Sequence, residues 1–294
     1  MGSFPPQEAT LSTWVCPACA VPCEQRYCTR CGEKRIEPHD LTLAGLIGHA
    51  AELLTHVDGR VLRSVKDLFV HPGLLTRAYI EGPRRRYFAP FQLFLLANVL
   101  FFLVQAGIGF QTLSNSLSSH IGEHSVGSQV YGPLAKPLLE RRLVATGRRL
   151  EDYRPVFDHA VRVNAKLLAV VLVLPFALIA VATYPGRRRP LIVHVVFAVH
   201  FVAFFLLLSS VLLPLVGLPL GAVLRYTHVP ENWDPIISLL LLAILGTYWC
   251  LAARRVYRVP LALAGAKTLV LLAALFPTII AYRFVVFLVT LYTT

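Results

Sequence analysis

Four cysteines near the start of the chain have the spacing of metal ligands. Cys16 and Cys19 form one C-x2-C pair, and Cys28 and Cys31 form a second. A C-x2-C turn can direct two thiolates at one ion, and Zn²⁺ prefers four such ligands in a tetrahedron. Two turns joined by a short connector therefore predict a structural zinc site of the zinc-ribbon type, with these four cysteines as ligands.

The residues that follow the two cysteine pairs differ, and a fifth cysteine lies between the pairs. Gly32 follows the second pair, and glycine accepts the positive φ that such a turn favours. Ala20 stands at the matching place after the first pair, so that turn departs from the usual pattern. Cys23 is the spare thiol and could compete for one ligand position. Disulfide bonds are the alternative interpretation, but they require an oxidising compartment.

The rest of the chain has the composition of a membrane protein. Of its 294 residues, 56% are hydrophobic and 15% are charged, whereas soluble domains carry about a quarter charged residues. Apolar runs of about 20 residues are long enough to cross a bilayer as helices. We therefore expect an all-α membrane protein with about five transmembrane helices. The runs cover about 90–110, 165–184, 190–215 and 235–253, and the fifth starts near 260.

The basic residues between the runs predict an orientation. The loop between the second and third runs contains the run 187–189 of three arginines, and the next basic loop contains Arg254, Arg255 and Arg258. Short cytoplasmic loops are enriched in Lys and Arg. Both loops are cytoplasmic only if the N-terminus is inside and the C-terminus is periplasmic, as in a bacterial inner-membrane protein. The arginines of segment 111–164 argue the other way, but long loops follow this rule poorly.

This orientation gives a three-part organisation. Residues 1–38 form a cytosolic zinc-ribbon-like head, and 39–89 form amphipathic juxtamembrane helices. Residues 90–294 form the five-span domain, with an extracytoplasmic loop at 111–164. The cysteines then lie in the reducing cytosol, where thiolates bind zinc and disulfides are rare. The basic face of 40–70 would lie on anionic lipid or pack against the ends of the spans.

Three consecutive arginines stand just before the first apolar run. Arg84, Arg85 and Arg86 precede Tyr87, which has the position of an interfacial anchor. Guanidinium groups form charge-assisted, bidentate hydrogen bonds with phosphate, so the triplet is a candidate lipid-binding site. The alternative is that the triplet only fixes the orientation of the chain.

Two longer patterns carry a resemblance. The head ends in "YCTRCG", and "HPGLLTRAYIEGPRRRYFAPF" leads into the first apolar run. Together they resemble an uncharacterised bacterial family of multi-span membrane proteins with a paired-cysteine head and a PG…Y..G.R..Y..P block. The resemblance covers roughly 16–105, and Glu33 replaces the glutamine usual in that family. It implies this architecture and implies no chemistry.

Few residues have a catalytic pattern. His194 and His200 lie in the third run, where an ionisable group suggests a functional site. Six residues apart on a helix, they point about 120° away from each other, and His200 is the deeper one. The pattern H-x-x-E-H at 120–124 matches an inverted zinc-peptidase motif, but its Gly- and Ser-rich surroundings favour a loop.

The sequence thus favours a non-enzymatic protein for binding, assembly or lipid handling. Its expected partners are membrane lipids, anionic ones included, and a protein partner of the head. The net charge of +12 is explained by cytoplasmic loops, so no nucleic acid is expected. The alternative is a membrane-embedded enzyme or transporter with a polar site around His200. A polar cavity at His200 would favour this alternative, and a solid apolar bundle would favour the first function.

Overall fold

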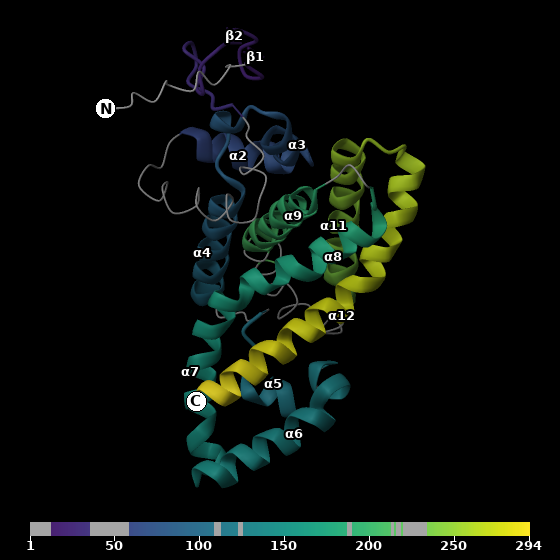
Figure 1. Ribbon diagram of the computed structural model, residues 1–294. Helices are drawn as coiled ribbons and strands as arrows, with labels where there is room; N and C mark the ends of the chain where they lie inside the picture. Colours follow the sequence, from purple (N-terminus) through teal and green to yellow (C-terminus); the bar gives the residue numbers. More distant parts are fainter. Residues whose placement is uncertain are drawn as a thin grey trace, which may run out of the picture.

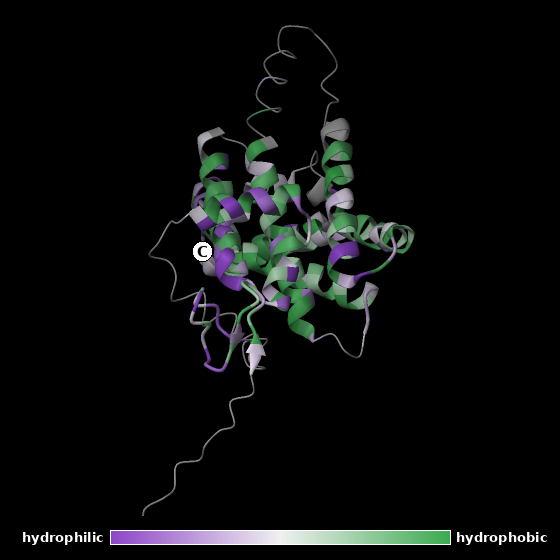
Figure 2. Ribbon diagram, turned by 90° about the horizontal axis from the view of Figure 1, so that it is seen from above, coloured by the Kyte–Doolittle hydropathy of each residue, from purple (hydrophilic) through white to green (hydrophobic). Residues whose placement is uncertain are grey.

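The computed structural model describes residues 13–35, 59–108, 113–122, 126–186, 190–212 and 234–294, and the single residues Leu215 and Pro219. Over these ranges the chain is an all-α membrane protein with a small β-hairpin in its cysteine-rich head (Figure 1). Hydrophilic residues gather in the loops of the head, and hydrophobic residues dominate the helices (Figure 2). The predicted fold class is confirmed.

The head is built on two short pieces of antiparallel pairing. Strand β1 (Trp14–Val15) pairs with β2 (Pro22–Cys23), with Trp14 opposite Cys23. The second piece is an isolated bridge between Tyr27 and Lys34. Each pairing closes one C-x2-C turn, so the two halves of the head have the same plan.

Two short helices connect the head to the membrane helices. They are α2 (Gly59–Val70) and α3 (Leu74–Glu81), followed by the 3₁₀ turn η2 (Arg84–Arg86). Between α2 and α3, Gly73 has φ 79°, and a Cβ there would lie 2.7 Å from the carbonyl oxygen of Ala252. Glycine is needed at this close approach, which fixes α3 against α11 (Asp234–Tyr257). The part of the predicted amphipathic segment from 39 to 58 lies outside the described residues.

Within the described ranges, five helical segments are long and apolar enough to cross a membrane, as the sequence predicts. α4 (Pro90–Ile108) lies in the first, and α9 (Leu191–Leu212) in the third. In the most apolar stretch of the third segment, 83% of the residues are buried, against 28–44% in the other four. α9 is therefore the central helix, and α4 packs along it. The five segments are Arg84–Gly107, Leu150–Thr183, Leu191–Val211, Leu239–Tyr257 and Leu261–Thr293.

The second segment starts earlier than its apolar run. It consists of α7 (Leu150–Leu168), the 3₁₀ turn η3 (Ala169–Leu172) and α8 (Val173–Thr183). α7 is polar on one side and buries a residue at every fourth position along its length, namely Tyr153, Phe157, Val161 and Ala165. This stripe has the helical period, and α7 packs against α12 (Leu261–Thr293). The start of α7 is apolar on one side only and forms no continuous apolar run, so the sequence did not mark it as part of a span.

Segment 111–164 contains further helices within its described part. They are α5 (Leu117–Ile121), α6 (Val126–Thr146) and the first half of α7. α5 packs on α6 and α7, and α6 contacts α12. In Figure 1 these helices lie at the end of the molecule opposite the head.

The basic turn after α11 and the end of α8 lie at the end of the bundle that holds α2 and α3. The turn after α11 is tied there, because Arg258 forms a 2.8 Å ion pair with Glu81 and Arg255 donates to the carbonyl oxygen of Pro72. The end of α8 lies beside the same turn, since the rings of Tyr184 and Tyr257 stack with centroids 4.3 Å apart. The loop that contains the arginine run 187–189 therefore starts at this end.

The C-terminus lies at the opposite end. The hydroxyl groups of Tyr153 and Thr294 are 2.6 Å apart, and Asn164 donates to Thr290. α12, which ends there, carries Pro277 near its middle. The helix bends in Figure 1, as expected for a helix that contains proline.

Candidate metal centre and the cavity beside it

The four predicted ligands come together in the head. The Sγ atoms of these residues all lie within 4.8 Å of one another. The residues are Cys16, Cys19, Cys28 and Cys31. Cys16 and Cys31 are 3.5 Å apart at sulfur, as are Cys19 and Cys28, and all are free thiols. A disulfide needs about 2.05 Å, whereas ligands of one tetrahedral Zn²⁺ lie about 3.8 Å apart. The arrangement could hold a metal ion.

The two C-x2-C turns have the same backbone geometry. In the first, the N–H of Ala20 donates to the carbonyl of Cys16 at 2.8 Å. In the second, the N–H of Gly32 donates to the carbonyl of Cys28 at 2.7 Å. Ala20 has φ 57° and Gly32 has φ 69°, so alanine adopts the left-handed conformation that glycine adopts in the second turn. The departure seen in the sequence therefore leaves the turn intact, at a conformational cost of about 1–2 kcal/mol.

The backbone of the second turn favours a thiolate at one position. The N–H groups of Cys31 and Arg30 point at the sulfur of Cys28 and lower the pKa of that thiol to about 6. At Cys31 burial and hydrogen bonds with the other thiols outweigh the N–H of Glu33 and raise the pKa to about 12. Four thiolates repel one another without a cation between them, which is the charge problem that a metal ion solves.

Cys23 lies beside this group and outside it. Its thiol is 3.4 Å from the carbonyl oxygen of Val21, and its side chain is buried with Cys16 and Cys28. Among the described residues, the group of four potential ligands does not include Cys23. Cys23 packs against the ligand-bearing turns like a small apolar side chain.

The second turn is docked onto the segment before α4. Nη1 of Arg85 donates to the carbonyl oxygen of Cys31 at 2.9 Å, and the backbone N–H of Arg85 donates to Glu33 at 3.3 Å. A Cβ on Gly32 would collide with the guanidinium group of Arg85. Burial raises the pKa of Glu33, while the N–H of Arg85 and the charges of Arg85 and Arg84 act in the opposite direction. The head thus contacts the membrane domain through Cys31 and the two residues that follow it.

The first turn contacts the same segment. Gly82 has φ 143°, and a Cβ there would collide with the ring of Pro17, which lies between the first two ligands. Both turns therefore rest on the chain between α3 and α4. Ser64 of α2 accepts a hydrogen bond of 2.8 Å from the N–H of Phe88, which holds the end of this segment.

The three arginines have three different environments. Arg84 donates from Nε to the carbonyl oxygen of Tyr79, and its guanidinium lies 4.5 Å from the centre of the Tyr79 ring. Arg85 makes the contacts with the head described above. Arg86 is exposed and lies 6.0 Å from the ring centre of Tyr87. The structure does not bring the triplet together as one cluster.

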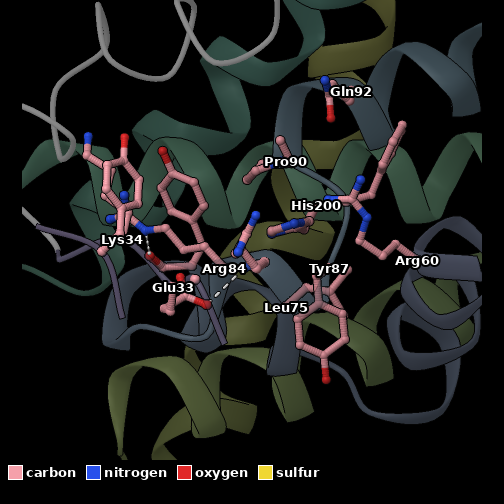
Figure 3. Close-up of a pocket in the computed structure, with 15 residues that line it drawn as sticks. Glu33, Lys34, Arg60, Leu75, Arg84, Tyr87, Pro90, Gln92 and His200 are labelled. Atoms are coloured by element: carbon pink, nitrogen blue, oxygen red, sulfur yellow. Dashed lines mark hydrogen bonds between the residues drawn. The ribbon is translucent and has the colours of Figure 1, made fainter. Parts of the chain in front are cut away.

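A cavity of about 360 Å³ lies between the docked head and the membrane helices (Figure 3). Its wall is formed by the end of the head, α2, α3, η2, the start of α4 and one residue of α9. Most of the wall surface is apolar, and charged side chains such as Arg60, Arg84 and Glu33 interrupt it. His200 of α9 contributes to the wall and is 3% exposed. The lining residues are Tyr27, Gly32, Glu33, Lys34, Arg60, Leu75, Tyr79, Arg84, Arg85, Tyr87, Phe88, Ala89, Pro90, Gln92 and His200.

The two predicted intramembrane histidines have separate partners. Nδ1 of His200 lies 2.9 Å from the hydroxyl oxygen of Thr76 in α3. Nδ1 of His194 lies 3.0 Å from the hydroxyl oxygen of Tyr257, and the two rings stack. His200 therefore borders the cavity, and His194 belongs to the aromatic cluster beside the α11–α12 turn.

Sequence reasoning missed most residues of the cavity. Gln92 is 2% exposed, and neither atom of its amide has a hydrogen-bond partner in the described part of the chain. A polar residue two positions after Pro90, in an otherwise apolar run, was the available signal. Thr76 carried no signal, because its role depends on contact with α9.

A second polar contact lies at the opposite end of the bundle. His120 is in α5, and its Nδ1 lies 2.7 Å from the hydroxyl oxygen of Tyr131. Burial lowers the pKa of His120 to about 4. Glu123 and His124 of the H-x-x-E-H pattern lie outside the described residues.

Part of the chain is similar to a known protein family. Residues 58–102 match the model of a family described as Protein of unknown function (DUF3667). The matched segment contains α2, α3, η2 and the first part of α4, and it includes most residues of the cavity wall. The chain is therefore similar to this family over the segment on which the head docks. Comparisons with curated proteins and with solved structures gave no match.

Proposed function

We propose that this chain is a multi-pass protein of the bacterial inner membrane whose cytoplasmic head is stabilised by one zinc ion. Cys16, Cys19, Cys28 and Cys31 are the ligands. Zinc is favoured over other metals because four thiolates in paired turns suit its tetrahedral coordination. The hydrogen bond from Arg85 to the carbonyl of Cys31 carries this proposal, since it joins the metal centre to the membrane domain.

The proposed topology has the N-terminus in the cytoplasm and the C-terminus in the periplasm. The turn after α11 lies beside α2 and α3, and the second basic loop starts at the same end, directly after α8. This arrangement supports the topology, because short basic loops remain in the cytoplasm. The proposed parts are the head at 1–38, the juxtamembrane segment at 39–89 and the membrane domain at 90–294. Segment 111–164 is then extracytoplasmic.

The proposed activity is binding, assembly or lipid handling without catalysis. Two features support it: a head held against the membrane domain by backbone contacts, and a cavity at that junction. Membrane lipids, anionic ones included, are the proposed partners, and the exposed side of the head is available to a protein partner.

A membrane-embedded enzyme or transporter is the second candidate, because His200 lines a cavity whose mainly apolar wall also carries charged side chains. On the sequence alone, a polar cavity around His200 was the feature expected to favour this function. The Nδ1 atom of His200 is already paired with Thr76, which leaves Nε2 as the only ring nitrogen for chemistry.

Hydrogen exchange of the full-length protein in detergent, with and without a zinc chelator, tests the leading proposal. Metal removal should increase exchange in the head and also at residues 82–87, because the N–H of Arg85 loses its partner Glu33. Exchange in α9 and α12 should stay unchanged. Increased exchange in the head alone would show that the metal does not support the docking.

A further inference from the structure

The cavity between the head and α4 has an excess of positive charge among the described residues of its wall. Lys34 comes from the head, Arg60 from α2, and Arg84 and Arg85 from η2. Glu33 is the single carboxyl group among the lining residues. These cations come from three separate segments, so the positive potential converges on one partly enclosed space, where it acts more strongly than on a flat surface.

The N-terminus of α4 opens into the same space. Ala89, Pro90 and Gln92 belong to the cavity wall, and α4 continues from Pro90 to Ile108. The N–H groups in the first turn of a helix lack intrahelical acceptors, and the helix dipole favours an anion at this place.

Gln92 adds an independent observation. It is 2% exposed, and its amide nitrogen and oxygen both lack a hydrogen-bond partner in the described structure. A buried amide without partners costs about 1–3 kcal/mol, so an unused donor in a cavity wall indicates a ligand that accepts its hydrogen bond.

We propose that this cavity is a binding site for a phosphate monoester, held by Lys34, Arg60, Arg84 and Arg85 and by the first turn of α4 with Gln92. The four cations suit a dianion, and guanidinium groups bind phosphate oxygens in a bidentate manner. The volume of about 360 Å³ lies near the lower end of the range of about 300–1,000 Å³ for small-molecule sites. It suits a headgroup or a small soluble molecule and is too small for a whole lipid.

The proposal revises the lipid site expected from the sequence. Arg86 is outside the cavity wall, and Lys34, Arg60 and Gln92 take part instead. The site rests on the proposed function, because Lys34 belongs to the zinc-stabilised head. It also adds a specific ligand chemistry to that function.

The test uses the full-length, metal-loaded protein in neutral detergent and isothermal titration calorimetry with three probes. Dioctanoyl phosphatidate carries the phosphate monoester on a lipid, glycerol 3-phosphate carries it on a soluble molecule, and dioctanoylglycerol lacks it. We expect phosphatidate to bind and dioctanoylglycerol to give no signal. Binding of phosphatidate alone assigns the site to a lipid headgroup, and equal binding of glycerol 3-phosphate assigns it to a soluble phosphate ester.

Variants locate the bound phosphate. Lys34→Gln and Arg60→Gln should each weaken binding about tenfold, as expected for loss of one charge-assisted hydrogen bond. Gln92→Leu should also weaken binding and should not lower thermal stability, because the amide has no partner to lose. Arg86→Gln removes the same charge from an exposed site outside the cavity and is the matched control.

Two results would overturn the site. One is the absence of binding by both phosphate probes to protein that retains its metal. The other is an equal loss of affinity in Arg86→Gln and Arg60→Gln, which would indicate general surface charge. Metal content is measured on the same samples. Phosphate binding by protein that contains no zinc would refute the proposed zinc-stabilised head and leave the cavity site standing.

Discussion

Nη1 of Arg85 donates a hydrogen bond of 2.9 Å to the carbonyl oxygen of Cys31, 54 positions earlier in the chain. Cys31 carries one of the four clustered thiols, and Arg85 lies at the entrance to the first membrane helix. This hydrogen bond therefore links the cluster of four thiols directly to the membrane domain. Gly32 makes the approach possible, because a Cβ there would collide with the guanidinium group.

The first prediction concerns metal content. Purified protein should contain about one Zn²⁺ per chain, since one four-thiolate site binds one ion. Cys16→Ser and Cys31→Ser should lose it, and Cys23→Ser should retain it, because Cys23 is outside the group of four. Inductively coupled plasma mass spectrometry measures the ratio. Loss of zinc in Cys23→Ser together with retention in Cys16→Ser would mean that the ligands are wrongly assigned.

The second prediction uses the two matching turns. Ala20→Gly should stabilise the head by about 1 kcal/mol, because glycine adopts φ 57° without the strain of a Cβ. Gly32→Ala should destabilise it and loosen its docking, since the new Cβ collides with Arg85. Competition with a chelator measures zinc retention in both variants. Equal retention in the two would contradict the conformational argument.

The cysteine spacing and the apolar runs were sufficient to predict the cluster of four thiols and the five candidate spans, because both signals are local in sequence. The start of the second membrane segment at Leu150 was not predicted. The reason is that α7, which begins there, is apolar only on the side that faces α12. The cavity could not be predicted either. Its wall joins Lys34, Arg60 and His200, and no local pattern connects positions so far apart.

The third prediction concerns topology. Reporter fusions after Gly186 and Tyr257 should give a cytoplasmic signal, and a fusion at Thr294 should give a periplasmic one. The reason is that Tyr184 stacks on Tyr257 at the end of the bundle that holds α2 and α3. A reporter inserted after Gly147, between α6 and α7, should report the periplasm. A cytoplasmic signal there would exclude the five-span orientation.

The fourth prediction separates the arginines. Arg85→Gln should release the head from η2, because it removes the hydrogen bond to Cys31. The expected effect on docking is about 1 kcal/mol, small because the contact is partly exposed. Arg86→Gln removes the same charge one residue later and should leave docking intact. Limited proteolysis between 36 and 58 measures release of the head, and equal cleavage of both variants would contradict the assignment.

The last prediction concerns the buried pair at the base of the cavity. Thr76 is 1% exposed, and its hydroxyl lies 2.9 Å from Nδ1 of His200. Thr76→Val keeps the shape and removes the hydroxyl, which leaves a buried ring nitrogen without this partner. The variant should therefore be less stable by about 1–3 kcal/mol. Thr76→Ser keeps the hydroxyl and should stay closer to the wild type. Thermal unfolding in detergent compares the two. An unchanged midpoint in Thr76→Val would mean that the His200 ring finds another partner in the cavity, and this result would favour the second candidate function.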